Sequence, residues 1–286
     1  MIVINPEEIS TPQLHAYLLS AVAPRPIAFA STIDKAGRPN LSPFSFFNVF
    51  SANPPILVFS PARRVSNNTT KHTLENIEEI GEVVINVVSY NMVQQVSLAS
   101  TEYGKGVNEF VKAGFTMLPS ETVKPFRVKE SPVQIECKVN EIIHLGHEGG
   151  AGSLIICEVL KMFISDAVLD ENNQIDQHKL DLVARAGGSY YSRAKEGFFE
   201  IPKPIQNLGI GFDQLPDEVL CSEVLTGNNL AALANVEKLP TQTDVDNFAV
   251  ENRHFVGLRT EEKHKFAQQH IENNDVLTAW KILLTK

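Results

Sequence analysis

The stretch PIAFASTIDKAGRPNLSPFSFFN, residues 26–48, decides the fold class of this chain. Residues 26–33 are types that favour β-strands, and the tetrapeptide at 34–37, Asp-Lys-Ala-Gly, is typical of a turn that ends on glycine. Because residues 38–48 then return along the first segment, the stretch predicts a β-hairpin.

Further strands follow the hairpin at short and regular spacing. Residues 133–143 (VQIECKVNEII) alternate apolar and polar side chains, as a half-buried antiparallel strand does. Residues 154–164 (LIICEVLKMFI) are more continuously apolar, which predicts a more central strand. Shorter strands are predicted at 56–60 and 82–89.

Helices interrupt this pattern at 70–80 and 92–100. The first begins on a threonine, carries apolar residues such as Leu74 and Ile77, and stops at Gly81. Short strands with few long helices between them favour a closed antiparallel barrel over βαβ repeats. A doubly wound sheet is the alternative, but the sequence lacks both GxGxxG and GxxxxGK[ST].

The composition and hydrophobic pattern of the sequence change after about Pro202. Residues 201–215 (IPKPIQNLGIGFDQL) are rich in proline and glycine and are typical of a connector. Helical patterns then follow at 228–236, 243–251, 260–273 and 275–284. We expect residues 1–200 to form the barrel domain. We expect residues 201–286 to form a C-terminal extension that packs on the barrel or on a partner subunit.

Composition and charge exclude several classes of function. Apolar types make up 43% of the chain and the net charge is −9, so we expect a soluble globular protein that does not bind nucleic acid. No run of 18 apolar residues occurs, which predicts no membrane span. Because the first residues lack the basic and apolar regions of a signal peptide, we expect a cytoplasmic protein.

Cysteine and histidine spacing predicts no metal site. Cys137, Cys157 and Cys221 are widely spaced and form no CxxC, which disfavours both a structural zinc and a disulfide framework. His144 and His147 are three residues apart but have no two further ligands nearby. No GxSxG or similar nucleophile context is present, so a hydrolase is also disfavoured.

The hairpin is dense in hydroxyl, amide and aromatic side chains. The short hydrogen-bonding residues are Ser31, Thr32, Asn40, Ser42, Ser45 and Asn48, and the aromatic ones are Phe44, Phe46 and Phe47. A planar heteroaromatic ligand with polar edges needs this mixture of stacking surface and small donors or acceptors. The alternative is a hairpin whose outer face carries ordinary polar residues.

The loop between the strand at 56–60 and the helix at 70–80 is basic. Its candidate ligands for a phosphate are Ser60, Arg63, Arg64, Lys71 and Thr73, next to a helix N-terminus that supplies free N–H groups. No acid occurs between Asp34 and Glu75. The alternative is a solvated basic loop. Together, hairpin and loop suggest a ligand with a ring at one end and a phosphate at the other.

These segments also resemble a known family. The run from Arg25-Pro26 through STIDKAGRPNLSPFSFFN, NPPILVFSPARR, KHTLENI and GEVVINVV is similar to the FMN-binding split-barrel proteins of the flavin reductase-like family. The similarity is greatest to the reductase components of nitrilotriacetate-type monooxygenases. It continues through VNEFVKAGFTMLPSE, ESPVQIECKV, GAGSLIICEV and LVARAGGSYYSR, so it covers roughly residues 10–195.

The resemblance implies a mainly β fold with helices: a six-stranded antiparallel Greek-key split barrel that binds FMN in a groove at a homodimer interface. It places Ser31, Thr32, Ser45, Phe46, Phe47 and Asn48 beside the isoalloxazine ring. It places Ser60, Arg63, Arg64, Lys71 and Thr73 at the phosphate, and it places Arg185, Gly187, Tyr190 and Tyr191 near the flavin. Spacing does not decide which of Arg63, Arg64 and Lys71 contacts the phosphate.

The sequence departs from the family before the strand at 154–164. Many flavin reductases carry an Asp-His pair there, near the nicotinamide, where this chain has Ala151-Gly152. His147 is a candidate to replace the missing histidine. The resemblance implies an NADH- or NADPH-dependent flavin reductase that supplies reduced flavin to a partner oxygenase or another acceptor. An FMN protein with a metal-ion or quinone acceptor, or a non-catalytic flavin-binding protein, is the alternative.

Overall fold

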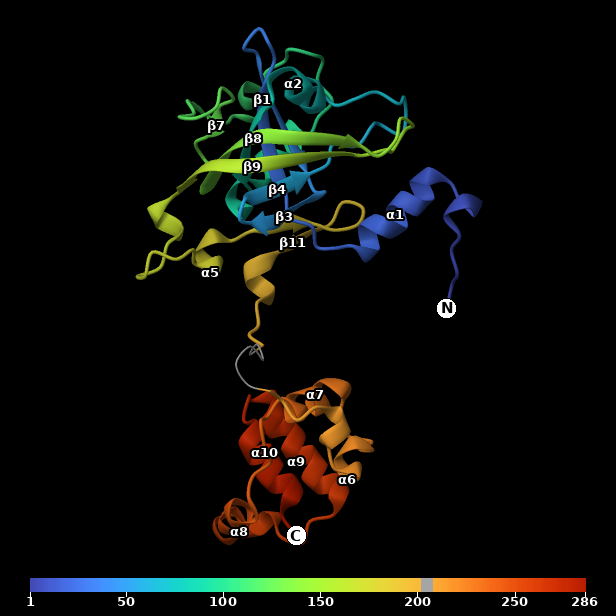
Figure 1. Ribbon diagram of the computed structural model, residues 1–286, viewed down its shortest axis with the longest axis vertical. Coiled ribbons are helices and arrows are strands. Elements are labelled where there is room, and N and C mark those ends of the chain that lie inside the picture. Colours follow the sequence, from blue (N-terminus) through green and yellow to red (C-terminus); the bar gives the residue numbers. More distant parts are fainter. Residues whose placement is uncertain (202–207) are drawn as a thin grey trace. The chain divides into compact units, whose positions relative to one another are not determined.

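The hairpin predicted at residues 26–48 begins a seven-stranded antiparallel sheet in the computed structural model, which describes residues 1–201 and 208–286 (Figure 1). In their order across the sheet the strands are β2 (Pro39–Phe44), β1 (Ala28–Ile33), β5 (Glu82–Val87), β8 (Val133–His144), β9 (Ser153–Ile164), β4 (Pro55–Phe59) and β3 (Phe47–Ala52). The chain divides into a barrel unit, residues 1–198, and a helical unit, residues 199–286. The connector predicted at 201–215 lies partly outside the described residues.

The strand predicted at 38–48 is two strands. β2 pairs with β1, whereas β3 pairs with β4, so that Phe47 lies opposite Phe59 on the far side of the sheet. The chain leaves the hairpin at Ser45 because Phe47 packs against the core that Phe59 also enters. The sheet therefore has seven strands instead of the six that the resemblance implies.

Strand β1 is buried along its whole length because hydrophobic residues cover both faces of the sheet. Ala28 and Ala30 belong to one cluster, which includes Leu74 of α2 (His72–Ile80). Phe29 points to the opposite face, in a second cluster with Phe110 of α4 (Glu109–Ala113). This alternation follows from the two-residue period of a strand.

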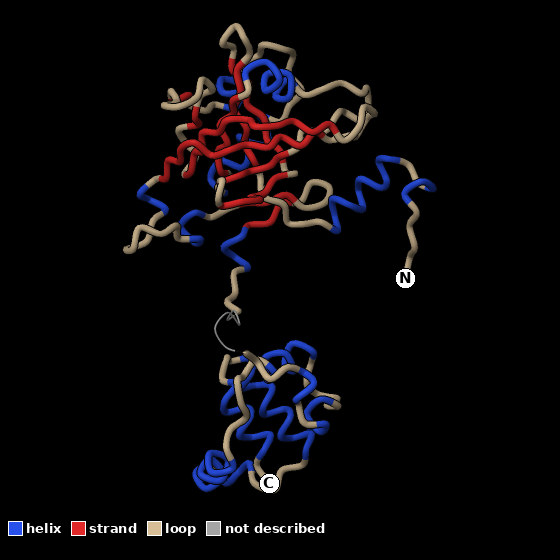
Figure 2. Tube along the Cα trace, viewed as in Figure 1, coloured by secondary structure: helices blue, strands red, loops and turns tan. Residues whose placement is uncertain are grey.

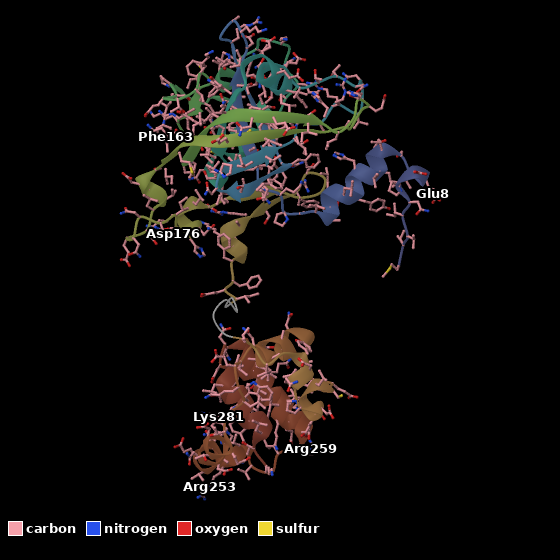
Figure 3. All side chains as sticks on the ribbon, in the orientation of Figure 1. Glu8, Phe163, Asp176, Arg253, Arg259 and Lys281 are labelled. Atoms are coloured by element: carbon pink, nitrogen blue, oxygen red, sulfur yellow. The ribbon has the colours of Figure 1, made fainter. Side chains whose placement is uncertain are left out.

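The remaining elements of the barrel unit surround this sheet. They are α1 (Thr11–Ala21), α3 (Val93–Ala99), β6 (Met117–Leu118), β7 (Arg127–Val128), α5 (Gln177–Leu180), β10 (Val183–Arg185) and β11 (Tyr191–Arg193). The predicted helix at 70–80 is confirmed, and it ends at Gly81 with a φ of 71° that favours glycine. Asp176, labelled in Figure 3, caps α5 by accepting hydrogen bonds from the N–H groups of His178 and Lys179.

The helical unit contains helices and no strand among residues 199–201 and 208–286 (Figure 2). They are α6 (Asp217–Leu220), α7 (Gly227–Ala234), α8 (Gln242–Glu251), α9 (Thr260–Glu272) and α10 (Val276–Leu284). Thr226 and Thr241 form capping boxes at α7 and α8. Trp280 is fully buried, and its indole N–H donates to the Leu233 carbonyl at 3.0 Å. How this unit packs against the barrel stays a prediction.

No helix within the described part of the chain has both the length and the apolar character needed to cross a membrane.

Candidate functional site

A buried polar cluster joins the hairpin to the first turn of α2. The Asn40 amide donates to Thr73 Oγ1 at 2.9 Å and to Thr32 Oγ1 at 3.4 Å, and the Asn76 amide also donates to Thr32 Oγ1, at 3.1 Å. All four side chains are buried. Because buried polar groups are costly without partners, this network fixes the start of α2 against strands β1 and β2.

A small polar pocket of about 20 Å³ opens at this end of α2. It is lined by Asn40, Ser42, Arg64, Lys71, His72, Thr73, Ser100, Thr101, Glu102, Tyr103 and Glu109. Lys71 is the residue before the helix, and its side chain makes no capping hydrogen bond. The pocket thus combines the positive end of the α2 dipole with two cationic side chains.

Arg64 and Lys71 converge on one carboxylate. Arg64 Nε lies 2.7 Å and Lys71 Nζ 3.6 Å from Glu102 Oε1. Burial, together with the charge of Arg64, lowers the pKa of Lys71, and the contact with Arg64 lowers the pKa of Glu102. Glu102 is 59% exposed, while the Arg64 side chain is 14% exposed. An exposed acid therefore screens two less accessible cations.

Glu109 is the second acid of the pocket and is buried. Its Oε2 accepts a hydrogen bond from the Leu41 N–H at 3.0 Å, which ties α4 to β2. Burial raises the pKa of this carboxyl. The group is consequently a weaker source of negative charge than Glu102.

Arg63 faces a different environment from Arg64. Its guanidinium donates to the side-chain oxygen and to the carbonyl of Asn68, both at 2.6 Å, and so closes the loop of residues 63–68. Arg63 does not line the pocket at α2. Of the three cations predicted for a phosphate, the structure brings Arg64 and Lys71 together and sets Arg63 apart.

The glycine-rich loop before β9 packs on this basic loop. The Arg63 N–H donates to Ala151 O at 2.8 Å, and the Gly150 N–H donates to Arg63 O at 3.0 Å. A Cβ atom at Gly152 would lie 2.6 Å from Ser60 Oγ, so any larger residue would require the Ser60 hydroxyl to move. His147 belongs to the same loop, and its side chain is exposed.

The turn between β2 and β3 carries the predicted ring contacts. Ser45 Oγ accepts a hydrogen bond from Arg25 Nε at 3.4 Å, and Phe46 makes an edge contact with His15 of α1, with ring centroids 6.3 Å apart. Phe47 packs against the barrel core, whereas the exposed Asn48 accepts from the N–H of the next residue.

Ser31 stands apart from this turn. It is fully buried, and its hydroxyl has no hydrogen-bond partner among the described residues. It lies opposite Leu41 in the β1–β2 ladder, one position from Thr32, so the two side chains point to opposite faces of the sheet.

The late aromatic segment lies on the β10–β11 hairpin. Arg185 stacks on Tyr191 with 4.6 Å between the guanidinium carbon and the ring centroid. Tyr191 also lines a pocket of about 210 Å³ with Tyr90 and Arg193, and Tyr190 is 78% exposed. These tyrosines do not line the pocket at α2.

Sequence reasoning missed Glu102, Tyr103, Glu109 and Asn76 as neighbours of the pocket. Only a weak signal pointed to them, namely the polar run STEYG at 100–104 after the helix predicted at 92–100. Of the described residues, none form a group of three or more His, Cys, Asp or Glu side chains able to hold a metal ion.

The pocket chemistry fits a phosphate. A guanidinium, an ammonium, small hydroxyls and a helix N-terminus are the groups that bind phosphate oxygens. The volume of about 20 Å³ suits one small polar group and is too small for a three-ring system. A flavin ring would therefore lie outside this pocket.

Comparisons with known proteins identify the family. The model of the flavin reductase like domain matches residues 20–183. An uncharacterised protein of Halalkalibacterium halodurans is 37% identical over 197 residues, which cover 68% of this chain and 93% of that protein.

Two solved structures share the fold of the barrel unit. Nitrilotriacetate monooxygenase component B from Bacillus cereus is 28% identical with a TM-score of 0.65, covering 70% of this chain and 98% of that one. The 2-nitrobenzoate 2-nitroreductase of Pseudomonas fluorescens is 25% identical with a TM-score of 0.65, covering 73% and 100%. With a family match over more than half of its length and a split-barrel fold, this chain belongs to the flavin reductase like family and is a flavin-dependent oxidoreductase.

Proposed function

We propose that the chain binds FMN and reduces it with NADH or NADPH. The observation that carries this proposal is the convergence of Arg64 and Lys71 at the α2 N-terminus, in a protein whose net charge is −9. The two cations and the helix N-terminus suit the doubly charged terminal phosphate that FMN carries and the dinucleotide FAD lacks, which favours FMN.

Arg64 and Lys71 would hold the phosphate by charge-assisted hydrogen bonds. Glu102 is the exposed partner that a phosphate would displace, because both cations already face it. Thr73 and Asn40 are bonded to each other, so they position the helix end and leave the phosphate to the cations.

The flavin, when bound, supplies the redox chemistry by accepting a hydride from nicotinamide C4 at its N5 atom. This chain's part is to orient two planar rings, which needs stacking surface more than an acid or a base. Phe46 and the main chain of the Ser45 turn supply such surface, and Arg185, Tyr190 and Tyr191 lie on the neighbouring hairpin. Because no proton donor is required, we assign His147 no proton transfer, and its place near the nicotinamide stays a prediction.

A homodimer is part of the proposal. Strand β3 is an edge of the sheet, and on it Val49 and Phe50 are 64% and 67% exposed. An exposed apolar edge strand is a template for pairing with another chain, and a second copy of this chain is the simplest partner. The flavin ring would then lie between the two copies.

The physiological acceptor has two candidates. The likeness to nitrilotriacetate monooxygenase component B favours a partner oxygenase that receives reduced flavin. The likeness to a 2-nitrobenzoate 2-nitroreductase favours direct reduction of an organic acceptor by flavin that stays bound.

An anaerobic stopped-flow experiment tests the proposal. Protein loaded with FMN is mixed with NADH or with NADPH, and flavin absorbance is followed. We expect at least one of the two nicotinamides to bleach the flavin absorbance. If the protein stays yellow, that is oxidised, with both NADH and NADPH, only a flavin-binding function is left. Adding 2-nitrobenzoate to the reduced protein then separates direct acceptor reduction from release of reduced FMN.

A further inference from the structure

Arg25 is a buried arginine whose partners are all neutral. Arg25 is 6% exposed. Its guanidinium donates to the carbonyl oxygens of Leu19 at 2.5 Å, Val22 at 2.6 Å and Ala186 at 3.2 Å. Its Nε donates to Ser45 Oγ. The side chain therefore joins the end of α1, the turn between β2 and β3, and the segment after β10.

Arg185 adds a second cation next to Arg25. The main chains of Arg25 and Arg185 form a two-way bridge, with both N–H to carbonyl distances at 2.8 Å. The Arg185 guanidinium donates to Gly188 O and stacks on Tyr191. Burial and the charge of Arg185 both lower the pKa of Arg25, as expected when no acid compensates it.

Neither arginine has an ion-pair partner within the described part of the chain. Arg193, on the same hairpin, is different because Asp181 accepts two hydrogen bonds from it, at 2.7 and 2.8 Å. Carbonyl oxygens satisfy N–H donors but do not neutralise a charge. The last carbonyls of α1 offset part of the Arg25 charge, but no carboxylate neutralises either arginine, so the pair keeps a positive charge that a bound anion would complement.

We propose that Arg25 and Arg185 form an uncompensated cationic pair that stabilises negative charge on the reduced flavin ring. This inference rests on the proposed function, which places the ring at the Ser45 turn. Hydride transfer removes one hydrogen nucleus with two electrons from the nicotinamide, which becomes a cation, and adds one negative charge to the flavin. Charge near the flavin ring nitrogens is a recognised way for a protein to tune this equilibrium.

Arg25 acts here through Ser45 and through the fold, so it is a positioning residue as well as a source of charge. Arg185 is only half-buried, and its main-chain bridge does not depend on its side chain. The Arg185→Gln variant therefore removes one charge and leaves the hydrogen bonds of Arg25 in place. Arg25→Lys keeps the other charge but loses the fork that joins three segments.

The test is the midpoint potential of bound FMN in the full chain. For Arg185→Gln we expect reduced FMN to lose about tenfold in affinity relative to oxidised FMN, which lowers the potential by about 30 mV for a two-electron couple. Arg193→Gln is the matched control, because Lys195, whose Nζ lies 3.4 Å from Asp181 Oδ2, still neutralises that carboxylate when Arg193 is lost, and its potential should equal that of the parent. Arg25→Lys should keep the potential while the flavin-free protein melts at a lower temperature.

The outcomes separate this inference from the proposed function. An unchanged potential in an Arg185→Gln protein that binds FMN overturns the inference alone. An equal shift in Arg193→Gln also overturns it, because any lost arginine would then have the same effect. A parent protein that binds no FMN overturns the proposed function and the inference with it.

Discussion

The barrel unit and the helical unit bury different kinds of side chain. Among the described residues of the helical unit, the buried polar side chains are Asn229, His264 and Thr285, and its core is built on Trp280. The barrel unit buries more polar groups, including a charged Arg25 and the four-residue cluster at the α2 terminus. Because buried polar groups cost stability unless they are hydrogen-bonded, the barrel unit depends on satisfied polar networks where the helical unit depends on apolar packing.

The largest expected effect breaks the helical unit at its core. Trp280→Ala removes a fully buried side chain and leaves the Leu233 carbonyl without its donor, so we expect a loss of about 3–5 kcal/mol. Urea unfolding followed by circular dichroism measures it. Leu277→Ala, on the same helix but 57% exposed, is the control and should change stability by less than about 0.5 kcal/mol. Equal losses in both variants would contradict the buried core.

The second prediction breaks the phosphate anchor of the barrel unit. Each charge-assisted hydrogen bond is worth about 1.5–3 kcal/mol, so replacing Arg64 and Lys71 together with alanine should lower FMN affinity at least about a hundredfold. Riboflavin, which lacks the phosphate, should bind the variant and the parent equally. Isothermal titration measures both ligands.

Arg63→Ala is the matched control for this anchor. Its guanidinium is bonded to Asn68 and does not line the pocket, so we expect FMN affinity to fall less than about threefold. A loss as large as that of the double variant would place the phosphate on the other side of the loop.

The sequence predicted the helical unit and the barrel unit with unequal success, for a physical reason. Helices α7 to α10 begin within two residues of their predicted starts, because caps such as Thr226 and Thr241 act locally. The break at Ser45 could not be predicted, since it depends on Phe47 pairing with Phe59. The run SPFSFFN contains neither glycine nor an Asn-Gly or Asp-Gly turn signal that would mark a change of strand partner at Ser45.

The candidate site shows the same limit. Spacing identified the basic loop, but it did not separate Arg63 from Arg64, because the difference depends on Asn68 and Glu102 as partners. Glu102 lies 38 residues from Arg64 and was not predicted. Local chemistry was therefore predictable, whereas the pairing of distant side chains was not.

The third prediction tests the exposed edge of the barrel unit. Sedimentation should give about twice 31.6 kDa, and dilution to monomer should release FMN. Val49→Asp places a charge on the edge strand and should weaken self-association at least about tenfold, which is about 1.4 kcal/mol. Val250→Asp, on an equally exposed valine of the helical unit, is the control and should leave the mass unchanged. A monomer that retains FMN would refute the shared groove.

The fourth prediction removes the helical unit. Residues 1–198 contain two hydrophobic clusters of their own, so a chain that ends at Leu208 should bind FMN within about threefold of the parent. If the extension packs over the flavin, the shortened protein should also accept bulkier acceptors or turn over faster. If it only stabilises, the melting temperature should fall while activity per bound flavin stays the same. Steady-state kinetics and thermal melts distinguish these results, and loss of FMN binding would contradict the independence of the barrel unit.

The smallest expected effect is a pH response of opposite sign in the two units. Burial raises the pKa of Glu109, so the folded barrel holds that proton more tightly than the unfolded chain, and this contribution to stability is lost as pH rises above about 4.5. Burial lowers the pKa of His264, whose Nδ1 lies 2.7 Å from Ser222 Oγ, so its contribution is lost as pH falls below about 6.5. Glu109→Gln should flatten the pH dependence of the barrel unit and His264→Gln that of the helical unit, while Glu223→Gln, an exposed control, should alter neither.

Urea unfolding between pH 4.5 and 7.5 measures the two slopes separately. Trp280 fluorescence reports on the helical unit and bound FMN reports on the barrel unit. Slopes of the same sign, or slopes that survive both substitutions, would show that other groups control the pH response and that the two units do not differ in this way.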